Sequence, residues 1–165
     1  KFEKGYNTQP AADLTEKPGY ALELSRFQGM RRIRLSLLTR NGEAHNRGNG
    51  LNWGLSDSTR IRKDKDSAFI PTRDAKNWGF FPGWDKQYFI IQDFHDGDMM
   101  FFGVIGGTAG KNLSSSEDNQ ILGRWFRDKL GIPHGTLITK QHLTDYGKTY
   151  ADFYKVDDET FLIDF

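Results

Sequence analysis

The residues of this chain best suited to recognise another molecule lie between Thr39 and Trp53, in the run TRNGEAHNRGNGLNW. The run has no apolar period, and a connection of this length in a compact domain is usually functional or disordered. Arginine can bond the edge of guanine twice, asparagine can do the same with adenine, and glutamate can accept from cytosine. We therefore expect a base-reading arm here, with an ordinary turn-rich loop as the alternative. The candidate readers are Arg40, Asn41, Glu43, His45, Asn46, Arg47 and Asn52, and Asn49 is also of the adenine-reading type.

Some residues of this run have a second reading. Asn41 and Asn52 either read bases or brace the arm from inside. Trp53 is expected to pack beneath the arm as an anchor rather than to read a base. Glycines allow such an arm to bend close to a duplex, and the run contains Gly42, Gly48 and Gly50.

A second irregular segment, GTAGKNLSSSEDN, runs from Gly107 to Asn119. It follows an apolar strand pattern, as a phosphate-binding loop would. However, Ile105 stands where the P-loop needs its first glycine and Asn112 where it needs Ser or Thr, so nucleotide hydrolysis is not predicted. We expect a second reading arm, in which Glu117 and Asp118 either cap the next helix or accept from cytosine. Its candidate readers are Thr108, Lys111, Asn112, Ser114, Glu117, Asp118 and Asn119.

The charge of the chain is unevenly distributed. Its formal net charge is +1, but residues 26–65 contain ten Lys or Arg against three acids, so that this part carries +7 and the remainder −6. Such an asymmetry indicates one basic face and an anionic partner. The candidate phosphate contacts, which would set the register on a nucleic acid, are Arg32, Arg34, Arg60, Arg62 and Lys63.

Two other classes of function compete with nucleic-acid binding. Asp74 and Lys76, with acids upstream at Asp57, Asp64 or Asp66, could form a magnesium-dependent nuclease centre. Exposed aromatic residues could instead serve a module that binds a sugar or a peptide. No cofactor or metal site is predicted, because cysteine is absent and the four histidines lack ligand spacing.

The elements around the arms predict a mainly β domain with two helices, folded as a partly open barrel. Apolar alternation and turn residues place strands at 29–38, 68–71, 87–93, 99–106, 150–156 and 159–165. Residues 1–28 are expected to be a lead-in or linker, and 29–165 a single domain. The sequence contains no membrane-spanning run or signal peptide, and it lacks cysteine, which together favour the cytoplasm.

The first predicted helix begins after Ser116 as its N-cap, with Glu117 and Asp118 in its first turn, and ends at Gly131. The second spans residues 140–146 and ends at Gly147. The basic residues of the first helix are expected mostly on its polar side: Arg124, Arg127 and Lys129.

Four blocks of sequence together resemble one known family. They are RIRLSLLTRNGEAHNRGNGLNWG, KNWGFFPG, NQILGRWFR and LTDYGKTYADFYKVDDETFLIDF. They resemble the C-terminal DNA-binding domain of the phospholipase-D-type, metal-independent type II restriction endonucleases, over residues 29–165. The resemblance implies a seven-stranded B3-like pseudobarrel that grips double-stranded DNA with two arms in the major groove. One arm would match Thr39 to Trp53 and the other Gly107 to Asn119.

The resemblance also implies a division of labour. In this family a preceding phospholipase-D-like nuclease domain cleaves DNA through a histidine-lysine-aspartate motif. No histidine of this chain has a lysine two positions on. The chain is therefore expected to be the specificity half of a bacterial restriction endonuclease and not an enzyme itself, with double-stranded DNA and that nuclease domain as partners.

Overall fold

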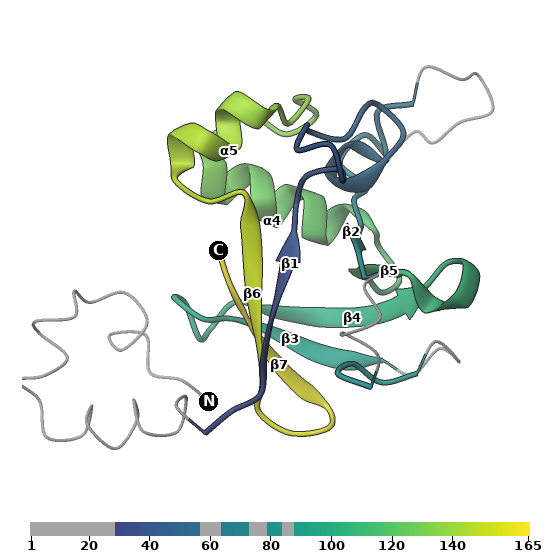
Figure 1. Ribbon diagram of the computed structural model, residues 1–165, viewed down its shortest axis with the longest axis vertical. Helices are drawn as coiled ribbons and strands as arrows, with labels where there is room; N and C mark the ends of the chain where they lie inside the picture. Colours follow the sequence, from purple (N-terminus) through teal and green to yellow (C-terminus); the bar gives the residue numbers. More distant parts are fainter. Residues whose placement is uncertain (1–28, 57–63, 73–78, 84–87) are drawn as a thin grey trace, which may run out of the picture.

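The chain curls a single sheet into a nearly closed barrel and packs two helices across one end of it (Figure 1). This computed structural model describes residues 29–56, 64–72, 79–83 and 88–165. Within these ranges the strands are β1 (Arg32–Ser36), β2 (Ile70–Pro71), β3 (Phe89–Asp93), β4 (Met100–Gly106), β5 (Asn112–Ser115), β6 (Tyr150–Lys155) and β7 (Thr160–Asp164). The helices are α4 (Gln120–Leu130) and α5 (Lys140–Tyr146), with short 3-10 turns η1 (Gly50–Asn52) and η3 (Thr108–Gly110).

The strand order explains the barrel. It runs β1-β6-β7-β3-β4-β5-β2, and every pair is antiparallel except β3 with β7, which is parallel. The two ends of this order, β1 and β2, come close to each other. The predicted seven-stranded, partly open barrel with two helices is therefore confirmed.

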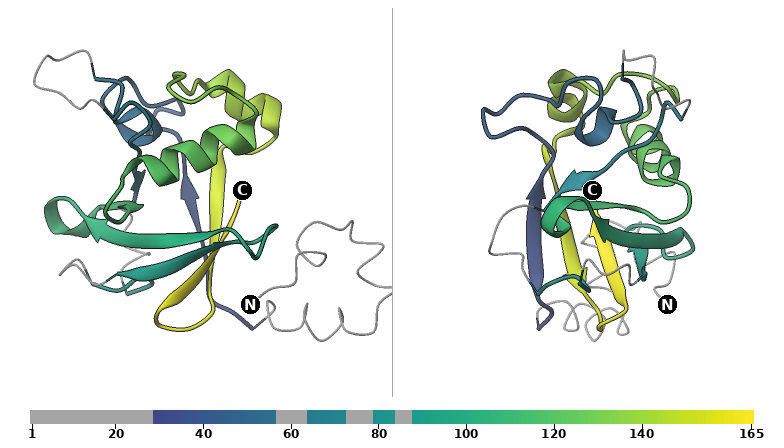
Figure 2. Two further views of the ribbon diagram at one scale, coloured as in Figure 1. Left: turned by 180° about the vertical axis from the view of Figure 1, so that it is seen from behind. Right: turned by 90° about the vertical axis from the view of Figure 1, so that its right-hand side faces the viewer.

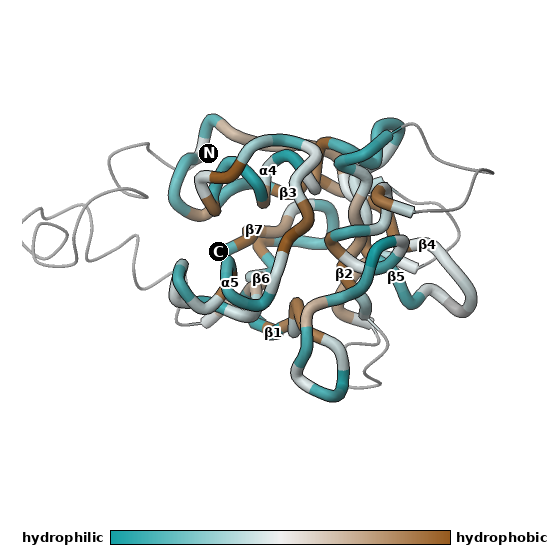
Figure 3. Tube along the Cα trace, turned by 90° about the horizontal axis from the view of Figure 1, so that it is seen from above, coloured by the Kyte–Doolittle hydropathy of each residue, from teal (hydrophilic) through white to brown (hydrophobic). Residues whose placement is uncertain are grey.

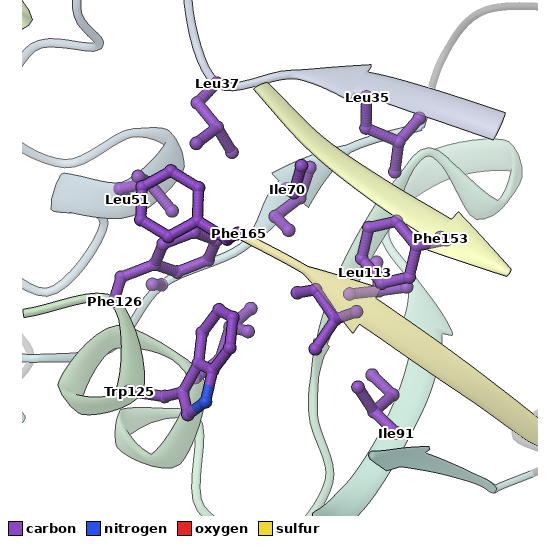
Figure 4. Packing of buried hydrophobic residues seen from close by; sticks show 14 of the residues in the cluster. Leu35, Leu37, Leu51, Ile70, Ile91, Leu113, Trp125, Phe126, Phe153 and Phe165 are labelled. Atoms are coloured by element: carbon purple, nitrogen blue, oxygen red, sulfur yellow. The ribbon is translucent and has the colours of Figure 1, made fainter. Parts of the chain in front are cut away.

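The core is filled by one face of each strand, as a period of two requires. In β6, Ala151 and Phe153 are fully buried, while Tyr150 and Tyr154 lie on the outer face. Helix α4 closes one end, with the ring of Phe126 4.9 Å from that of Phe165 (Figure 4). Aromatic rings carry much of this core, as the high aromatic content of the sequence indicates.

The start of α4 differs from the prediction. The helix begins at Gln120, so Glu117 and Asp118 precede its first turn and Ser116 is not its N-cap. The chain is not yet helical after β5: the Ser116 amide still donates to Phe102 O of β4 at 2.8 Å, and Glu117 has φ +66°, a conformation that a right-handed helix excludes. A neighbouring serine serves the helix instead, because the Ser115 hydroxyl accepts a hydrogen bond from the Leu122 amide at 3.1 Å. The predicted helix ends at Gly131 and Gly147, both in the left-handed conformation, are confirmed.

Arg127 was expected on the polar side of α4, and this was wrong, since its side chain is fully buried. It forms an ion pair with Asp66 at 3.1 Å and donates to the carbonyls of Thr136 at 3.0 Å and Leu51 at 3.4 Å. Burial lowers the pKa of the guanidinium, and the charge of Asp66 opposes this shift. Arg127 thus ties α4 to three other segments of the chain, one of which is η1.

Candidate nucleic-acid interface

The segment from Thr39 to Trp53, the N-arm, folds as two consecutive tight turns rather than one open loop. In the first turn the Gly42 amide donates to Thr39 O at 2.9 Å, and the Thr39 amide donates to Glu43 O at 2.8 Å. This is a β-turn with Arg40 and Asn41 in its two central positions. Both side chains are exposed at the tip.

The second turn runs from Asn46 to η1. The Asn49 amide donates to Asn46 O at 3.1 Å, and the Gly48 amide donates to Asn52 O at 2.8 Å. Asn46, Arg47 and Asn49 are exposed on this turn. His45 joins the two turns and packs on Gly50, where a Cβ atom would come within 2.5 Å of its ring. Gly50 also has φ +52°, so the turn depends on glycine at this position.

Asn52 was expected either to read a base or to brace the arm from inside, and the structure shows that it braces the arm. Its side chain is 1% exposed. The amide nitrogen donates to His45 O at 2.8 Å and to Ile138 O at 2.9 Å, and the amide oxygen accepts from the Ile138 amide at 2.8 Å. Because its side chain makes these bonds inside the protein, Asn52 is not available to bond a base. Trp53 lies beneath the arm, its ring edge-on to Phe69 at 5.3 Å between centroids.

The second irregular segment is shorter than predicted, because residues 112–115 form β5. The projecting part is the connection from Gly107 to Lys111, which contains η3 and which we call the C-arm. Thr108 and Lys111 are exposed on it, and Asn112 follows at the start of β5. The Thr72 amide donates to Lys111 O at 2.6 Å, which ties the C-arm to the chain that leaves β2.

The other candidates of this segment lie away from the C-arm. Ser114 is on the outer face of β5, beside Val104 of β4. Glu117, Asp118 and Asn119 come after the far end of β5, near α4. The Asp118 carboxylate accepts from the Gln120 amide at 2.9 Å, which favours its capping role. The predicted reading set is therefore divided between two places.

The two arms meet at an open hollow of about 420 Å³. Between them lies β2, which the second view of Figure 2 faces, and β2 is adjacent to β5 in Figure 3. The hollow brings together three predicted readers and four other residues, and its lining is Thr39, His45, Asn49, Phe69, Pro71, Lys111 and Asn112. Among these, Phe69 and Pro71 were not predicted as site residues. Alternation about the buried Ile70 could have placed both on the opposite face of β2.

A second hollow, of about 660 Å³, lies on the other side of the N-arm. It is bounded by residues 43–47 of the arm and by residues 137–140 at the start of α5. Glu43 is exposed in it, with a carboxylate oxygen 4.0 Å from the Lys140 ammonium. The turn that carries Asn46 and Arg47 therefore lies between two hollows.

The predicted phosphate contacts differ in whether a nearby carboxylate neutralises their charge. Arg34 donates both arms of its fork to Asp152, at 2.8 and 3.0 Å, and lies 3.6 Å from the centroid of the Tyr150 ring. The hydrogen bond that Arg34 donates to Asp152 raises the pKa of this guanidinium. Arg32 is exposed and 3.9 Å from the same carboxylate. Because Asp152 neutralises Arg34, this arginine is poorly placed as a phosphate anchor. Arg60, Arg62 and Lys63 lie outside the described residues.

The magnesium centre considered from the sequence finds no support in the described part of the chain. Asp66 is buried and engaged by Arg124 at 3.3 Å and Arg127 at 3.1 Å. Asp57, Asp74 and Lys76 lie outside the described residues. Residues 29–56, 64–72, 79–83 and 88–165 contain no cluster of three or more His, Asp or Glu side chains able to hold a metal ion.

The nearly closed, seven-stranded barrel with two helices is consistent with a B3-like pseudobarrel. A family model, the NgoFVII C-terminal B3-like DNA-binding domain, matches residues 25–157 of the chain. The chain belongs to this family of restriction-enzyme DNA-binding domains. No curated protein matches it. Among the described helices, none has both the length and the apolar character needed to cross a bilayer.

Proposed function

We propose that the chain is the target-recognition domain of a restriction endonuclease and reads double-stranded DNA through its two arms in the major groove. The observation that carries the proposal is the hollow bounded by both arms. Its lining includes the side-chain amide of Asn49 from the N-arm, and the ammonium of Lys111 and the side-chain amide of Asn112 from the opposite side. Membership of a DNA-binding family supports the choice of DNA as the partner.

Within this proposal the arms divide the readout. Arg40 and Arg47 would each donate two hydrogen bonds to guanine, while Asn41, Asn46 and Asn49 would read adenine or brace a neighbour. Glu43 would accept from cytosine. On the other side, Thr108, Lys111 and Asn112 would read the next base pairs. Apart from Asn112, which is half-buried at the start of β5, these side chains are exposed on short, internally bonded turns, and this supports the assignment.

Affinity would come from cations that neutralise phosphates, with little dependence on sequence. Arg32, Arg60, Arg62 and Lys63 are the proposed anchors. Hydrolysis would belong to a phospholipase-D-like nuclease domain that precedes residues 1–28 in the parent protein. Residues 29–165 would then form the recognition unit, and residues 1–28 the link between the two.

Selection of bound duplexes from a random DNA pool, at moderate salt and without metal, tests the proposal. Enrichment of one motif of a few base pairs is the expected result. Binding without enrichment would reduce the interface to a basic face, and absence of binding at low salt would refute it. Cleavage by the chain alone in magnesium would point instead to the nuclease alternative.

A further inference from the structure

The floor of the hollow between the arms is apolar, although its rim is polar. Ile70 of β2 is fully buried in the core, and its neighbours Phe69 and Pro71 are half-buried on the opposite face, where they line the hollow. The Phe69 amide already donates to Gly50 O at 3.0 Å, and proline has no amide hydrogen. Neither residue therefore presents a main-chain donor to a base.

This floor is held in a defined position relative to both arms. On the N-arm side, Phe69 is bonded to Gly50 and its ring meets Trp53 edge-on at 5.3 Å. On the C-arm side, the Thr72 hydroxyl donates to Gly110 O at 3.1 Å, and the Thr72 amide donates to Lys111 O. A base held between the arms would thus meet the apolar floor at a fixed place.

The chemistry of the major groove narrows what such a floor can accept. Base edges there present nitrogen and oxygen donors or acceptors, except for the C5 methyl group of thymine. A polar edge pressed against Phe69 and Pro71 would lose its water without gaining a partner, which is costly. A methyl group loses nothing and gains by burial.

From this geometry we propose that Phe69 and Pro71 form a subsite for the 5-methyl group of a pyrimidine at one position of the recognised sequence. The inference rests on the proposed function and adds a specificity element to it. Asn49 and Asn112, on opposite rims of the hollow, would read the base pairs on either side. Thymine and 5-methylcytosine carry the same methyl group, so the source of that group is decided by the test.

The test uses the sequence obtained by duplex selection. Each thymine in turn is replaced by deoxyuridine, which removes only the methyl group, and each cytosine in turn by 5-methylcytosine, which adds one. We expect one thymine position at which the change weakens binding about fourfold, the factor that corresponds to burial of one carbon group. If the methyl source is 5-methylcytosine, binding rises by a similar factor at one cytosine instead.

Variants then assign the effect to the floor. Phe69→Ala should abolish the methyl effect at that one position and leave discrimination at the other positions intact. Phe69→Leu keeps an apolar floor and should retain most of the effect. Pro71→Ala removes part of the floor without disturbing Trp53. If Phe69→Ala unfolds, the loss of the methyl effect is measured in Pro71→Ala instead. Phe94→Ala is the matched control, since Phe94 is also half-buried against another ring but lies after β3, at the opposite end of β4 from the C-arm.

The outcomes separate the inference from the proposed function. Specific binding in which no methyl group matters would overturn the subsite and leave the recognition function standing. The same conclusion holds if Phe69→Ala and Phe94→Ala have the same methyl effect. Failure to select any motif would remove the recognition function, and the subsite with it.

Discussion

The two arms face one hollow but are held in place by different means. The N-arm is anchored through buried polar groups, with Asn52 bonded to Ile138 and Arg127 bonded to Leu51, so its shape depends on distant segments. The C-arm is a five-residue connection between neighbouring strands, and two of its carbonyl groups accept hydrogen bonds from the amide and the hydroxyl of Thr72. Changes at the base of the N-arm should therefore affect stability and binding together, whereas changes in the C-arm should affect mainly binding.

The largest effect is expected at the buried arginine beneath the N-arm. Arg127→Ala would leave Asp66 buried without its closest charged partner and should lower the free energy of unfolding by about 3–5 kcal/mol. Urea denaturation measures the change. Arg124→Ala is the matched control, because its half-exposed guanidinium pairs with the same Asp66 and should cost less than about 1 kcal/mol. Equal losses would show that burial of Arg127 is not what anchors the arm.

The brace within the N-arm should give the next largest effect. Asn52→Ala leaves the His45 carbonyl and both main-chain groups of Ile138 without these partners, which should cost about 1–3 kcal/mol of stability. DNA affinity should fall at the same time. In Asn41→Ala, where the side chain is exposed, stability should stay within about 0.5 kcal/mol while binding weakens. A stable Asn52→Ala protein with unchanged affinity would refute the brace.

If the N-arm reads bases directly, substitution of its exposed arginines should weaken DNA binding without lowering the stability of the fold. Arg40→Ala and Arg47→Ala should each weaken binding to the selected site by about 1–3 kcal/mol and relax the preference at one base pair. Lys63→Ala, a proposed phosphate contact outside the described residues, should instead weaken all sequences about equally. Titration of each variant with the selected duplex and with a scrambled duplex measures both affinities. If arginine and lysine variants behave alike, the division into readers and anchors is wrong.

The smallest effect is expected in the C-arm. Gly107 has φ +77° and ψ 178°, a region restricted essentially to glycine that costs other residues about 1–3 kcal/mol, and an added Cβ would lie 2.7 Å from the side-chain amide nitrogen of Asn112. Gly107→Ala should therefore displace the Asn112 side chain and alter the base preference at one position, with a modest fall in melting temperature. Gly106→Ala is the control, since nothing lies within 4 Å of its added Cβ. A large loss of stability in Gly107→Ala would contradict the contrast between the arms.

Local patterns in the sequence predicted most of the barrel. The alternation of Ala151 and Phe153 with tyrosines, and the glycines that end both helices, depend on residues close together in the chain. The six predicted strands therefore differ from the observed ones mainly at their ends, but β5, which lies within the predicted second arm, was missed. Ser116 failed as an N-cap because its amide bonds Phe102 O of β4, and because the next residue, Glu117, has φ +66°, which lies outside the helical region.

The candidate site was predicted less completely. Arg40, Asn41, Asn46 and Arg47 could be selected by residue type, because exposed turns leave such side chains free. Residue type could not separate Asn52 from them, since its burial comes from Ile138, which is far away in the sequence. For the same reason the sequence predicted Arg34 as a phosphate contact, although Asp152, which is far away in the sequence, pairs with it in the folded chain.

Composition and periodicity were thus sufficient for the class of fold and for the presence of two polar segments. The folded chain decided which of these side chains face outward, and it placed Phe69 and Pro71 between the arms. The physical reason is that hydrophobic alternation is a property of neighbouring residues. The burial and pairing of a polar side chain depend instead on which distant segment covers it.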